Sequence, residues 1–186
     1  NETNGKSIFP TPVIGGVGII QNLKYIKGFY TPDNSLIYII GKTTGHLGSS
    51  LLYEHLKIIK GPPPKVDFNE EKKNGNFVKF LSHKTKILEG CHDISDGGVA
   101  VAISELCLAN KKGIEFKFKK NQMSPLKFLF GEDQSRYLVV INNKKEFETL
   151  AKQHKIEHEN IGIVTGNILN FHDLFIIPVA KLVTLN

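Results

Sequence analysis

Apolar positions along the chain predict a set of short strands. Residues 36–40 form an uninterrupted apolar run, which is typical of a strand that is buried on both faces. Further strands are predicted at 114–118, 137–141 and 161–164. The stretch 13–20 is also apolar, and because glycines interrupt it, it predicts a buried strand that another backbone or a ligand approaches closely.

The spacing of apolar residues predicts helices between these strands. Asp67 stands three positions before Glu70, which is the spacing of a capping box, so a helix is predicted over 67–81. Another begins after Gly98 and carries one apolar face, formed by Val99, Ile103, Leu106 and Cys107. Shorter helices are predicted at 51–56 and 144–154. This mixture indicates an α/β (α+β) fold, a layered domain in which helices flank a mixed β-sheet.

Length and hydropathy are those of an ordinary globular chain. With 186 residues, 40% of them hydrophobic, the chain has enough apolar matter for one domain, or for one domain and part of a neighbour. No apolar run approaches the roughly 18 residues that a membrane helix needs, and no secretory signal pattern is visible, so we expect no membrane partner. The first residue is Asn1 rather than Met, which leads us to expect a longer parent protein.

The charge balance is basic, but it does not have the composition of a nucleic-acid reader. The formal net charge is +6, and Arg136 is the only arginine among the 24 Lys and Arg residues. Surfaces that read bases favour arginine, because its planar fork makes two parallel hydrogen bonds. We therefore expect no nucleic-acid partner. The two cysteines, Cys91 and Cys107, are too few for a disulfide framework, and we expect a reducing, cytoplasmic compartment.

The segment 92–98, HDISDGG, is the richest in chemistry. Two carboxylates, a hydroxyl and two glycines lead directly into a predicted helix, whose first N–H groups and positive dipole end favour phosphate. A carboxylate beside a bound phosphate can also hold Mg²⁺, which prefers oxygen ligands. The alternative is structural: Ser95 or Asp96 caps the helix, and Gly97 and Gly98 make a tight turn. Because the segment matches no established phosphate-binding motif, both interpretations stay open.

Two further segments combine charge with turn residues. In 130–137, FGEDQSRY, the lone Arg136 suggests a position that needs a planar fork, either toward a ligand or in a salt bridge with Glu132 or Asp133. Glu132 and Gln134 could then present polar groups to a ligand. The loop 45–50 is either a second phosphate-binding loop or a strand-to-helix turn with a serine cap. The seven histidines show no zinc-ligand spacing.

Four blocks of sequence together resemble the phosphoribosylformylglycinamidine synthase family. IFPTPVIGGVGII, at 8–20, is similar to the junction between the two halves of proteins in the aminoimidazole ribonucleotide synthetase superfamily. GPPPKVDFNEE, CHDISDGGVAVAISE and FGEDQSRYLVVI follow in the order and at about the spacing of that family. The resemblance covers nearly the whole chain.

The resemblance implies a place within a larger enzyme. Residues 1–20 would be the tail of the second N-type domain and the junction, and residues 21–186 the second C-type domain, with the fold of the C-terminal domain of aminoimidazole ribonucleotide synthetase. It also implies an ATP-dependent carbon–nitrogen ligase of purine biosynthesis. This enzyme converts formylglycinamide ribonucleotide to the amidine, with ammonia that a glutaminase domain or subunit takes from glutamine. The family's catalytic histidines fall outside this chain, so we expect the isolated chain to be inactive.

The resemblance also implies ligand contacts. Asp93 would bind Mg²⁺ and Ser95 would bind ATP or ADP, with Gly97 and Gly98 in the same nucleotide-binding segment. Three residues match a string that contacts the ribonucleotide in the first C-type domain, and they form a substrate-like pseudo-site here: Glu132, Gln134 and Arg136. Expected partners are the remaining domains, the glutaminase and a small-molecule nucleotide. Two alternatives remain: a structural, nucleotide-holding module without catalysis, and a small-molecule kinase of the same superfamily.

Overall fold

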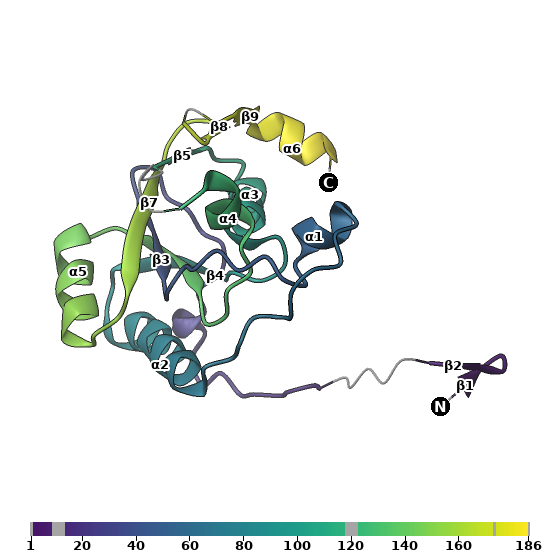
Figure 1. Ribbon diagram of the computed structural model, residues 1–186. Coiled ribbons are helices and arrows are strands. Elements are labelled where there is room, and N and C mark those ends of the chain that lie inside the picture. The colour runs from purple at the N-terminus through teal and green to yellow at the C-terminus, as the bar shows by residue number, and fades with distance from the viewer. Residues whose placement is uncertain (1, 9–13, 118–122, 173, 186) are drawn as a thin grey trace.

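A seven-stranded sheet organises the chain, and helices cover both of its faces (Figure 1). The computed structural model describes residues 2–8, 14–117, 123–172 and 174–185. At the N-terminus, β1 (Glu2–Thr3) and β2 (Lys6–Ser7) pair as a small hairpin that lies away from this body (Figure 1).

The sheet is mixed, as the sequence predicts. Its strands lie in the order β4-β6-β3-β7-β5-β8-β9, and the neighbours are antiparallel except for the parallel pair β5–β8. The bounds are β3 (Leu36–Ile40), β4 (Leu88–Asp93), β5 (Ile114–Phe116), β6 (Tyr137–Ile141), β7 (His158–Val164), β8 (Ile168–Asn170) and β9 (Ile176–Pro178). This arrangement confirms the predicted fold class.

Both faces of the central strands are buried, because side chains alternate along a strand. Ile37 and Ile39 of β3 pack in one hydrophobic cluster with α3 (Gly98–Asn110), α4 (Pro125–Phe130) and α6 (Val179–Leu185). Tyr38 and Ile40 face the opposite way and pack with α2 (Phe68–Lys84) and α5 (Lys144–Gln153). A continuous apolar run in the sequence is therefore what a strand between two helical layers requires.

The predicted elements agree with the structure where their pattern is strong. The strands at 36–40 and 137–141 have the predicted bounds, and β7 begins three residues before the predicted strand at 161–164. Asp67 caps α2 as predicted: its Oδ1 accepts hydrogen bonds from the backbone N–H of Asn69 at 2.9 Å and of Glu70 at 3.2 Å. The predicted face of α3 is wholly buried.

One of the predicted strands is absent. The stretch 13–20 was expected to form a buried strand, but residues 14–20 form no strand and are exposed, and residue 13 lies outside the described residues. Ile14, Val17 and Ile19 are each more than nine-tenths exposed. Apolar residues show that a segment is suited to burial, but they cannot show whether its partner belongs to the same chain. The described part of this chain offers no surface that covers them.

From Tyr25 onward the N-terminal segment contacts the body. The Tyr25 ring stacks on His83 of α2 at a centroid distance of 4.1 Å. The Gly28 carbonyl accepts a 2.8 Å hydrogen bond from Cys91 N in β4, which is one of the two edge strands of the sheet. This contact covers part of an edge that would otherwise expose unpaired backbone groups.

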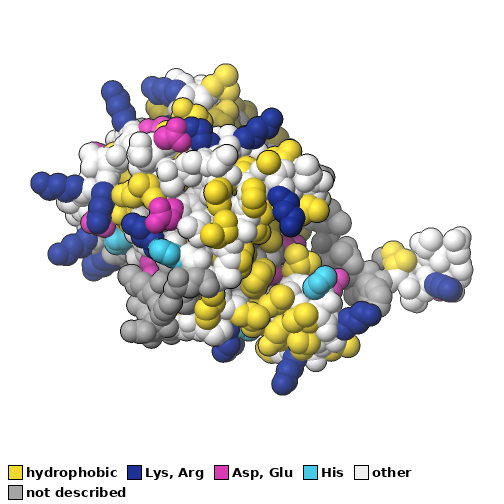
Figure 2. Space-filling model, turned by 90° about the horizontal axis from the view of Figure 1, so that it is seen from above, with side chains coloured by type: hydrophobic (Ala, Val, Ile, Leu, Met, Phe, Trp, Pro, Cys, Tyr) yellow, Lys and Arg dark blue, Asp and Glu magenta, His cyan; other side chains and the backbone are white. Residues whose placement is uncertain are grey.

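Other hydrophobic side chains also remain exposed. Figure 2 shows a face on which hydrophobic side chains gather across the middle and the lower right, with lysines around them. Exposed large residues include Leu51 in α1 (Leu51–His55), Leu56 and Ile59 just after it, and Leu185 at the end of α6. Contiguous apolar surface of this kind is typical of interaction sites. No helix in the described ranges is both long and apolar enough to cross a membrane.

Candidate functional site

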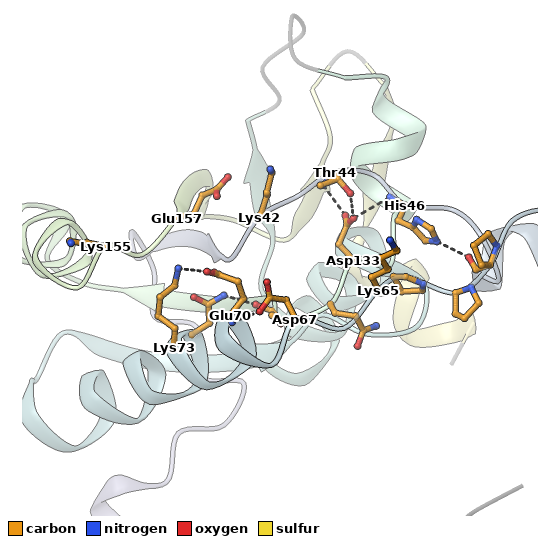
Figure 3. A pocket seen from close by; sticks show the side chains of 16 residues that line it. Lys42, Thr44, His46, Lys65, Asp67, Glu70, Lys73, Asp133, Lys155 and Glu157 are labelled. Atoms are coloured by element: carbon orange, nitrogen blue, oxygen red, sulfur yellow. Dashed lines mark hydrogen bonds and ion pairs between the residues drawn. The ribbon is translucent and has the colours of Figure 1, made fainter.

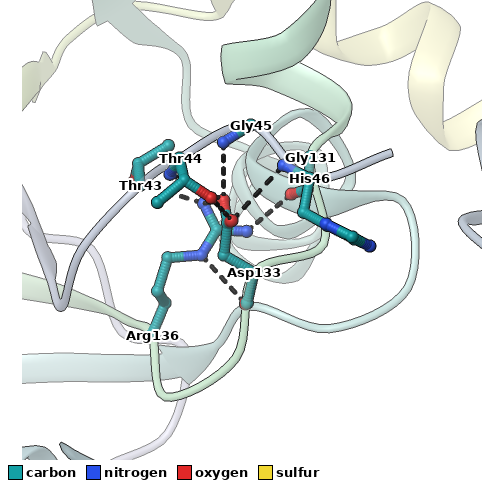
Figure 4. A network of polar contacts seen from close by, with 7 residues as sticks. All are labelled: Thr43, Thr44, Gly45, His46, Gly131, Asp133 and Arg136. Carbon is teal, nitrogen blue, oxygen red and sulfur yellow. Dashed lines mark hydrogen bonds and ion pairs between the residues drawn. The ribbon is translucent and has the colours of Figure 1, made fainter. Parts of the chain in front are cut away.

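Asp133 fills a cradle of backbone N–H groups in the loop after β3 (Figure 4). Its carboxylate accepts hydrogen bonds from Thr44 N at 3.0 Å, Gly45 N at 2.9 Å and His46 N at 3.3 Å, and another from the Thr44 hydroxyl. Consecutive N–H groups of this kind form an anion-binding concavity. The anion in this cradle is a side chain of the same chain.

Arg136 lies behind this carboxylate with a fully buried side chain. Its Nε donates to the Asp133 carbonyl at 3.1 Å, and its Nη2 to the Gly131 carbonyl at 2.5 Å. Nη1 donates to Thr43 Oγ1 at 3.3 Å and lies 3.8 Å from Asp133 Oδ2 (Figure 4). Of the two interpretations of this arginine, the buried salt bridge with Asp133 is therefore the one that the geometry supports.

The pair shifts the pKa of both partners. Burial raises the pKa of the Asp133 carboxyl, but the hydrogen bonds from Thr44 and Gly45 and the charge of Arg136 outweigh it and hold the pKa below its usual range. Burial lowers the pKa of the Arg136 guanidinium, against the opposing influence of the Asp133 and Glu132 carboxylates. The carboxylate is thus kept ionised by the cradle and the arginine together.

Like Asp133, Glu132 accepts hydrogen bonds from backbone N–H groups, in this case at the starts of two helices. Its Oε1 accepts hydrogen bonds from Leu51 N at the start of α1 and from Gly97 N at the start of α3, each 2.8 Å long. Carboxylates are favoured at helix N-termini, where N–H groups lack partners inside the helix. The two predicted phosphate-binding loops are therefore each in contact with a carboxylate of the 132–133 turn.

Removing the Glu132 carboxylate should loosen both helix starts. We expect Glu132→Ala to lower the free energy of unfolding by about 1–2 kcal/mol, since a lost helix cap costs about that much. Urea unfolding of the chain measures the change. Glu132→Gln keeps a carbonyl oxygen that can accept the same hydrogen bonds and should lose less. An Ala variant as stable as the wild type would show that the two contacts contribute nothing.

The start of α3 lacks the side-chain cap that the structural interpretation of 92–98 predicts. Gly97, in the left-handed region with φ of 77°, occupies the N-cap position, and no side chain caps the helix, so the prediction that Ser95 or Asp96 caps it is wrong. The predicted tight turn is confirmed. Gly98 has φ of 66°, and a Cβ there would lie 2.7 Å from the Gly131 carbonyl oxygen and 2.8 Å from that of Leu129. Glycine is required by this close approach.

Asp93 and Ser95 stand on the surface at the end of β4. Their side chains are exposed, and Asp93 Oδ1 lies 3.3 Å from His92 Nδ1, while His92 Nε2 lies 2.8 Å from Glu105 Oε2. Burial, and to a lesser degree the Asp93 charge, raises the pKa of the neighbouring Cys91 thiol to about 12, which does not suit a nucleophile. The two exposed oxygen-bearing side chains remain accessible to a ligand.

The serine cap predicted for the loop 45–50 is present. Ser50 accepts a hydrogen bond from Tyr53 N at the start of α1. The three residues predicted as a substrate-like pseudo-site differ in exposure: Glu132 contacts two helix starts, Arg136 is buried, and Gln134 is exposed and lines a cavity.

This cavity, of about 640 Å³, lies beside the Asp133 cradle (Figure 3). Its walls are the 42–46 loop, the proline-rich segment 62–65, the first turns of α2, the 133–135 turn and residues 155–157. Four lysines line it: Lys42, Lys65, Lys73 and Lys155. One lining residue could have been found from the sequence: Asn74 is a polar residue on the buried face of α2, which also carries Phe77 and Leu81.

In the described part of the chain, side chains that commonly bind metals are not clustered. Within it, no group of three or more His, Cys, Asp or Glu side chains is placed to hold a metal ion. Asp93 offers one exposed carboxylate, so a Mg²⁺ ion there would need further oxygen ligands from a nucleotide or from another domain.

Comparison with known proteins places these features in a family. A family model described as AIR synthase related protein, C-terminal domain, matches residues 31–170. The phosphoribosylformylglycinamidine synthase subunits PurL of Bartonella bacilliformis and Bartonella henselae are 40% and 41% identical to the chain, and each match covers 98% of this chain and 25% of the relative. The chain thus spans a quarter of the length of these relatives.

Solved structures show the same fold. Thermotoga maritima PurL complexed with FGAR aligns with a TM-score of 0.68 and 22% identity, covering 85% of this chain and 29% of that one. The same protein complexed with ATP aligns with a TM-score of 0.63 and 19% identity, covering 85% and 27%.

Proposed function

The chain belongs to the AIR synthase related family, whose C-terminal domain it contains, and on this premise we propose that it is the second C-type domain of a phosphoribosylformylglycinamidine synthase. The observation that carries the proposal is the identity of about 40% to PurL subunits over 98% of the chain. Because the chain spans a quarter of those subunits, the remaining domains would supply the rest of the enzyme.

In this proposal the whole enzyme joins nitrogen to formylglycinamide ribonucleotide at the expense of ATP. The parts of this chain would be residues 1–20, the end of the second N-type domain with the junction, and residues 21–186, the C-type domain. The exposed apolar residues of 14–20 support this division, since they suit burial against a neighbouring domain. The exposed apolar side chains around α1 support such packing as well.

We assign Asp93 and Ser95 to a nucleotide site that a neighbouring domain completes. Both side chains are exposed beside the start of α3, where the helix dipole favours phosphate. Asp93 would hold Mg²⁺, which would neutralise phosphate charge. Gly97 and Gly98 would contribute the close turn rather than N–H donors, because Gly97 N already donates to Glu132 and Gly98 N to the Ser95 carbonyl.

Further partners follow from the same proposal. The enzyme would take ammonia from a glutaminase domain or subunit. It would act in the cytoplasm, and the unpaired thiols of Cys91 and Cys107 suit a reducing compartment.

A chimeric enzyme tests the nucleotide site. The matching segment of the Bartonella henselae subunit is replaced by this chain, and protection by Mg-ADP is measured as a shift in Tm. We expect Asp93→Ala to reduce the shift, while Asp96→Asn, a charge loss at an exposed position of the same loop, leaves it unchanged. Equal shifts for the wild type and Asp93→Ala would rule out the assignment.

The structural alternative predicts a different outcome. The Asp133 cradle and the helix-start N–H groups of Leu51 and Gly97 already hold carboxylates of this chain, which favours a module that stabilises its neighbours without binding nucleotide. In that case the chimera would fold and turn over substrate, yet neither Asp93→Ala nor Ser95→Ala would change turnover or the Mg-ADP shift.

A further inference from the structure

His92 is a buried polar side chain that lies between two carboxylates beside the proposed nucleotide site. Its side chain is 9% exposed, its Nε2 lies 2.8 Å from Glu105 Oε2, and its Nδ1 lies 3.3 Å from Asp93 Oδ1. A buried imidazole needs a hydrogen-bond partner for its ring nitrogens, and these carboxylates provide one on each side. The two contacts also fix the direction in which each nitrogen points.

The Phe29 ring covers one face of this imidazole. The two rings stack at a centroid distance of 4.3 Å, with an angle of 25° between their planes. The backbone of Phe29 is held in turn, because the Asn110 amide donates to its carbonyl oxygen and Asn110 Oδ1 accepts a 3.3 Å hydrogen bond from Thr31 N. The imidazole therefore cannot tilt or turn without losing the contact with Phe29 or with Glu105.

Gly90 allows the segment 25–31 to lie close against β4. A Cβ at Gly90 would lie 3.0 Å from the Gly28 carbonyl oxygen and nearer still to that of Tyr30, so glycine is required there. The next residue of the strand, Cys91, donates its N–H to the Gly28 carbonyl. The place of Phe29 over His92 is thus fixed by the backbone as well as by Asn110.

Within the described ranges, the Asp93 carboxylate has one hydrogen-bond or ion-pair partner, the His92 ring. The Asp93 side chain is 67% exposed, and an aspartate on the surface can otherwise change rotamer easily. Contact with a fixed ring restrains Oδ1 and leaves Oδ2 without a partner among the described residues. A carboxylate that is oriented and still accessible is suited to bind Mg²⁺, which prefers oxygen ligands.

We propose that His92 is a positioning residue which, held by Glu105 and Phe29, orients the Asp93 carboxylate for the Mg²⁺ of a bound Mg-nucleotide. His92 does not touch the nucleotide itself. Carboxylates that bind metals are themselves held by hydrogen bonds, and losing such an outer partner weakens metal binding by roughly 10–100-fold. The inference rests on the proposed function, because it requires the nucleotide site at Asp93.

The chimeric Bartonella henselae subunit that carries this chain is the protein for the test, by calorimetric titration with ADP in the presence of Mg²⁺ and again with a chelator. His92→Leu and Glu105→Ala are each expected to weaken Mg-ADP binding about tenfold or more, and to leave binding of Mg-free ADP unchanged. A merely structural role would weaken both or neither. Because Glu105 is exposed, Glu105→Ala keeps the test available even if His92→Leu does not fold.

Variants of Phe29 test the stacking contact separately. Phe29→Leu should weaken Mg-ADP binding in the same selective way, because it removes the ring that covers His92. Phe29→Tyr keeps an aromatic ring and should bind like the wild type. Tyr30→Leu is the matched control: it removes the neighbouring ring, which is 60% exposed, and should leave both affinities unchanged.

Asp93→Ala separates failure of this inference from failure of the proposed site. If Asp93→Ala weakens Mg-ADP binding while the His92, Glu105 and Phe29 variants bind it like the wild type, the site stands and the positioning role is overturned. Equal weakening of Mg-ADP and Mg-free ADP by Glu105→Ala and Phe29→Leu would overturn that role as well. If Asp93→Ala binds Mg-ADP like the wild type, the site itself is wrong, and the inference fails with it.

Discussion

Replacing Arg136 by methionine is expected to lower the free energy of unfolding by about 3–5 kcal/mol, the cost of breaking a buried ion pair from one side. The substitution leaves the buried Asp133 carboxylate without its cation, and it leaves the carbonyl groups of Gly131 and Asp133 without their donors. Arg136→Lys should also lose stability, because an ammonium group cannot reproduce the fork that reaches several acceptors. Urea unfolding measures both variants.

Two controls make this result specific. Lys152→Met changes an exposed lysine of α5 and should alter stability by no more than about 0.5 kcal/mol. The double variant Asp133→Asn/Arg136→Met should lose less than the sum of the two single losses, because the partners share one network. Strictly additive losses would show that the two side chains do not act as a pair.

Asp133 should make the stability of the chain depend on acid pH. The folded-state pKa of this carboxyl lies below its unfolded value of about 3.9. Its contribution to stability is therefore fully present above that unfolded value and is lost as the pH falls through the lowered folded-state pKa. At neutral pH, Asp133→Asn should cost about 2–3 kcal/mol, since hydrogen bonds to a charged group are lost or weakened.

The prediction is a difference between two pH profiles. The gap in free energy of unfolding between the wild type and Asp133→Asn is expected to be constant from pH 7 down to about pH 5 and to shrink below about pH 4. Asp96→Asn, which changes an exposed carboxylate, serves as the matched control. A gap that is unchanged down to pH 3 would show that Asp133 does not carry a lowered pKa.

The sequence predicts an element of the fold where neighbouring residues alone show that it is buried or capped. The runs at 36–40 and 137–141 have to be strands between two helical layers, and the Asp67 cap marks where α2 begins. Short elements such as α4, β8 and β9 carry too few residues for a clear period, and they depend on tertiary packing. The apolar stretch 14–20 shows the limit of such patterns, because no surface among the described residues covers it.

The candidate site was harder to predict from the sequence, because carboxylates of the chain itself can accept the backbone N–H groups that would otherwise bind an anionic ligand. The pattern of 92–98 predicts a helix start that can bind an anion, and the group found at Gly97 N is the Glu132 carboxylate, 35 residues away in sequence. The first residues of the loop 45–50 belong to the cradle that Asp133 fills, and Asp133 lies 88 residues from Gly45 in sequence. Pairings of this kind are set by the tertiary fold. The lysine-lined cavity likewise gathers residues from five separate segments.

The proposed place in the ligase is tested most directly by turnover of the chimeric Bartonella henselae subunit that carries this chain. The assay follows ATP-dependent conversion of formylglycinamide ribonucleotide with ammonia as the nitrogen source. The same swap with the matching segment of the Pelagibacter ubique subunit, which is 34% identical to this chain, is the control. The proposal predicts turnover by both chimeras. A folded chimera that carries this chain and is inactive, beside an active control swap, would contradict it.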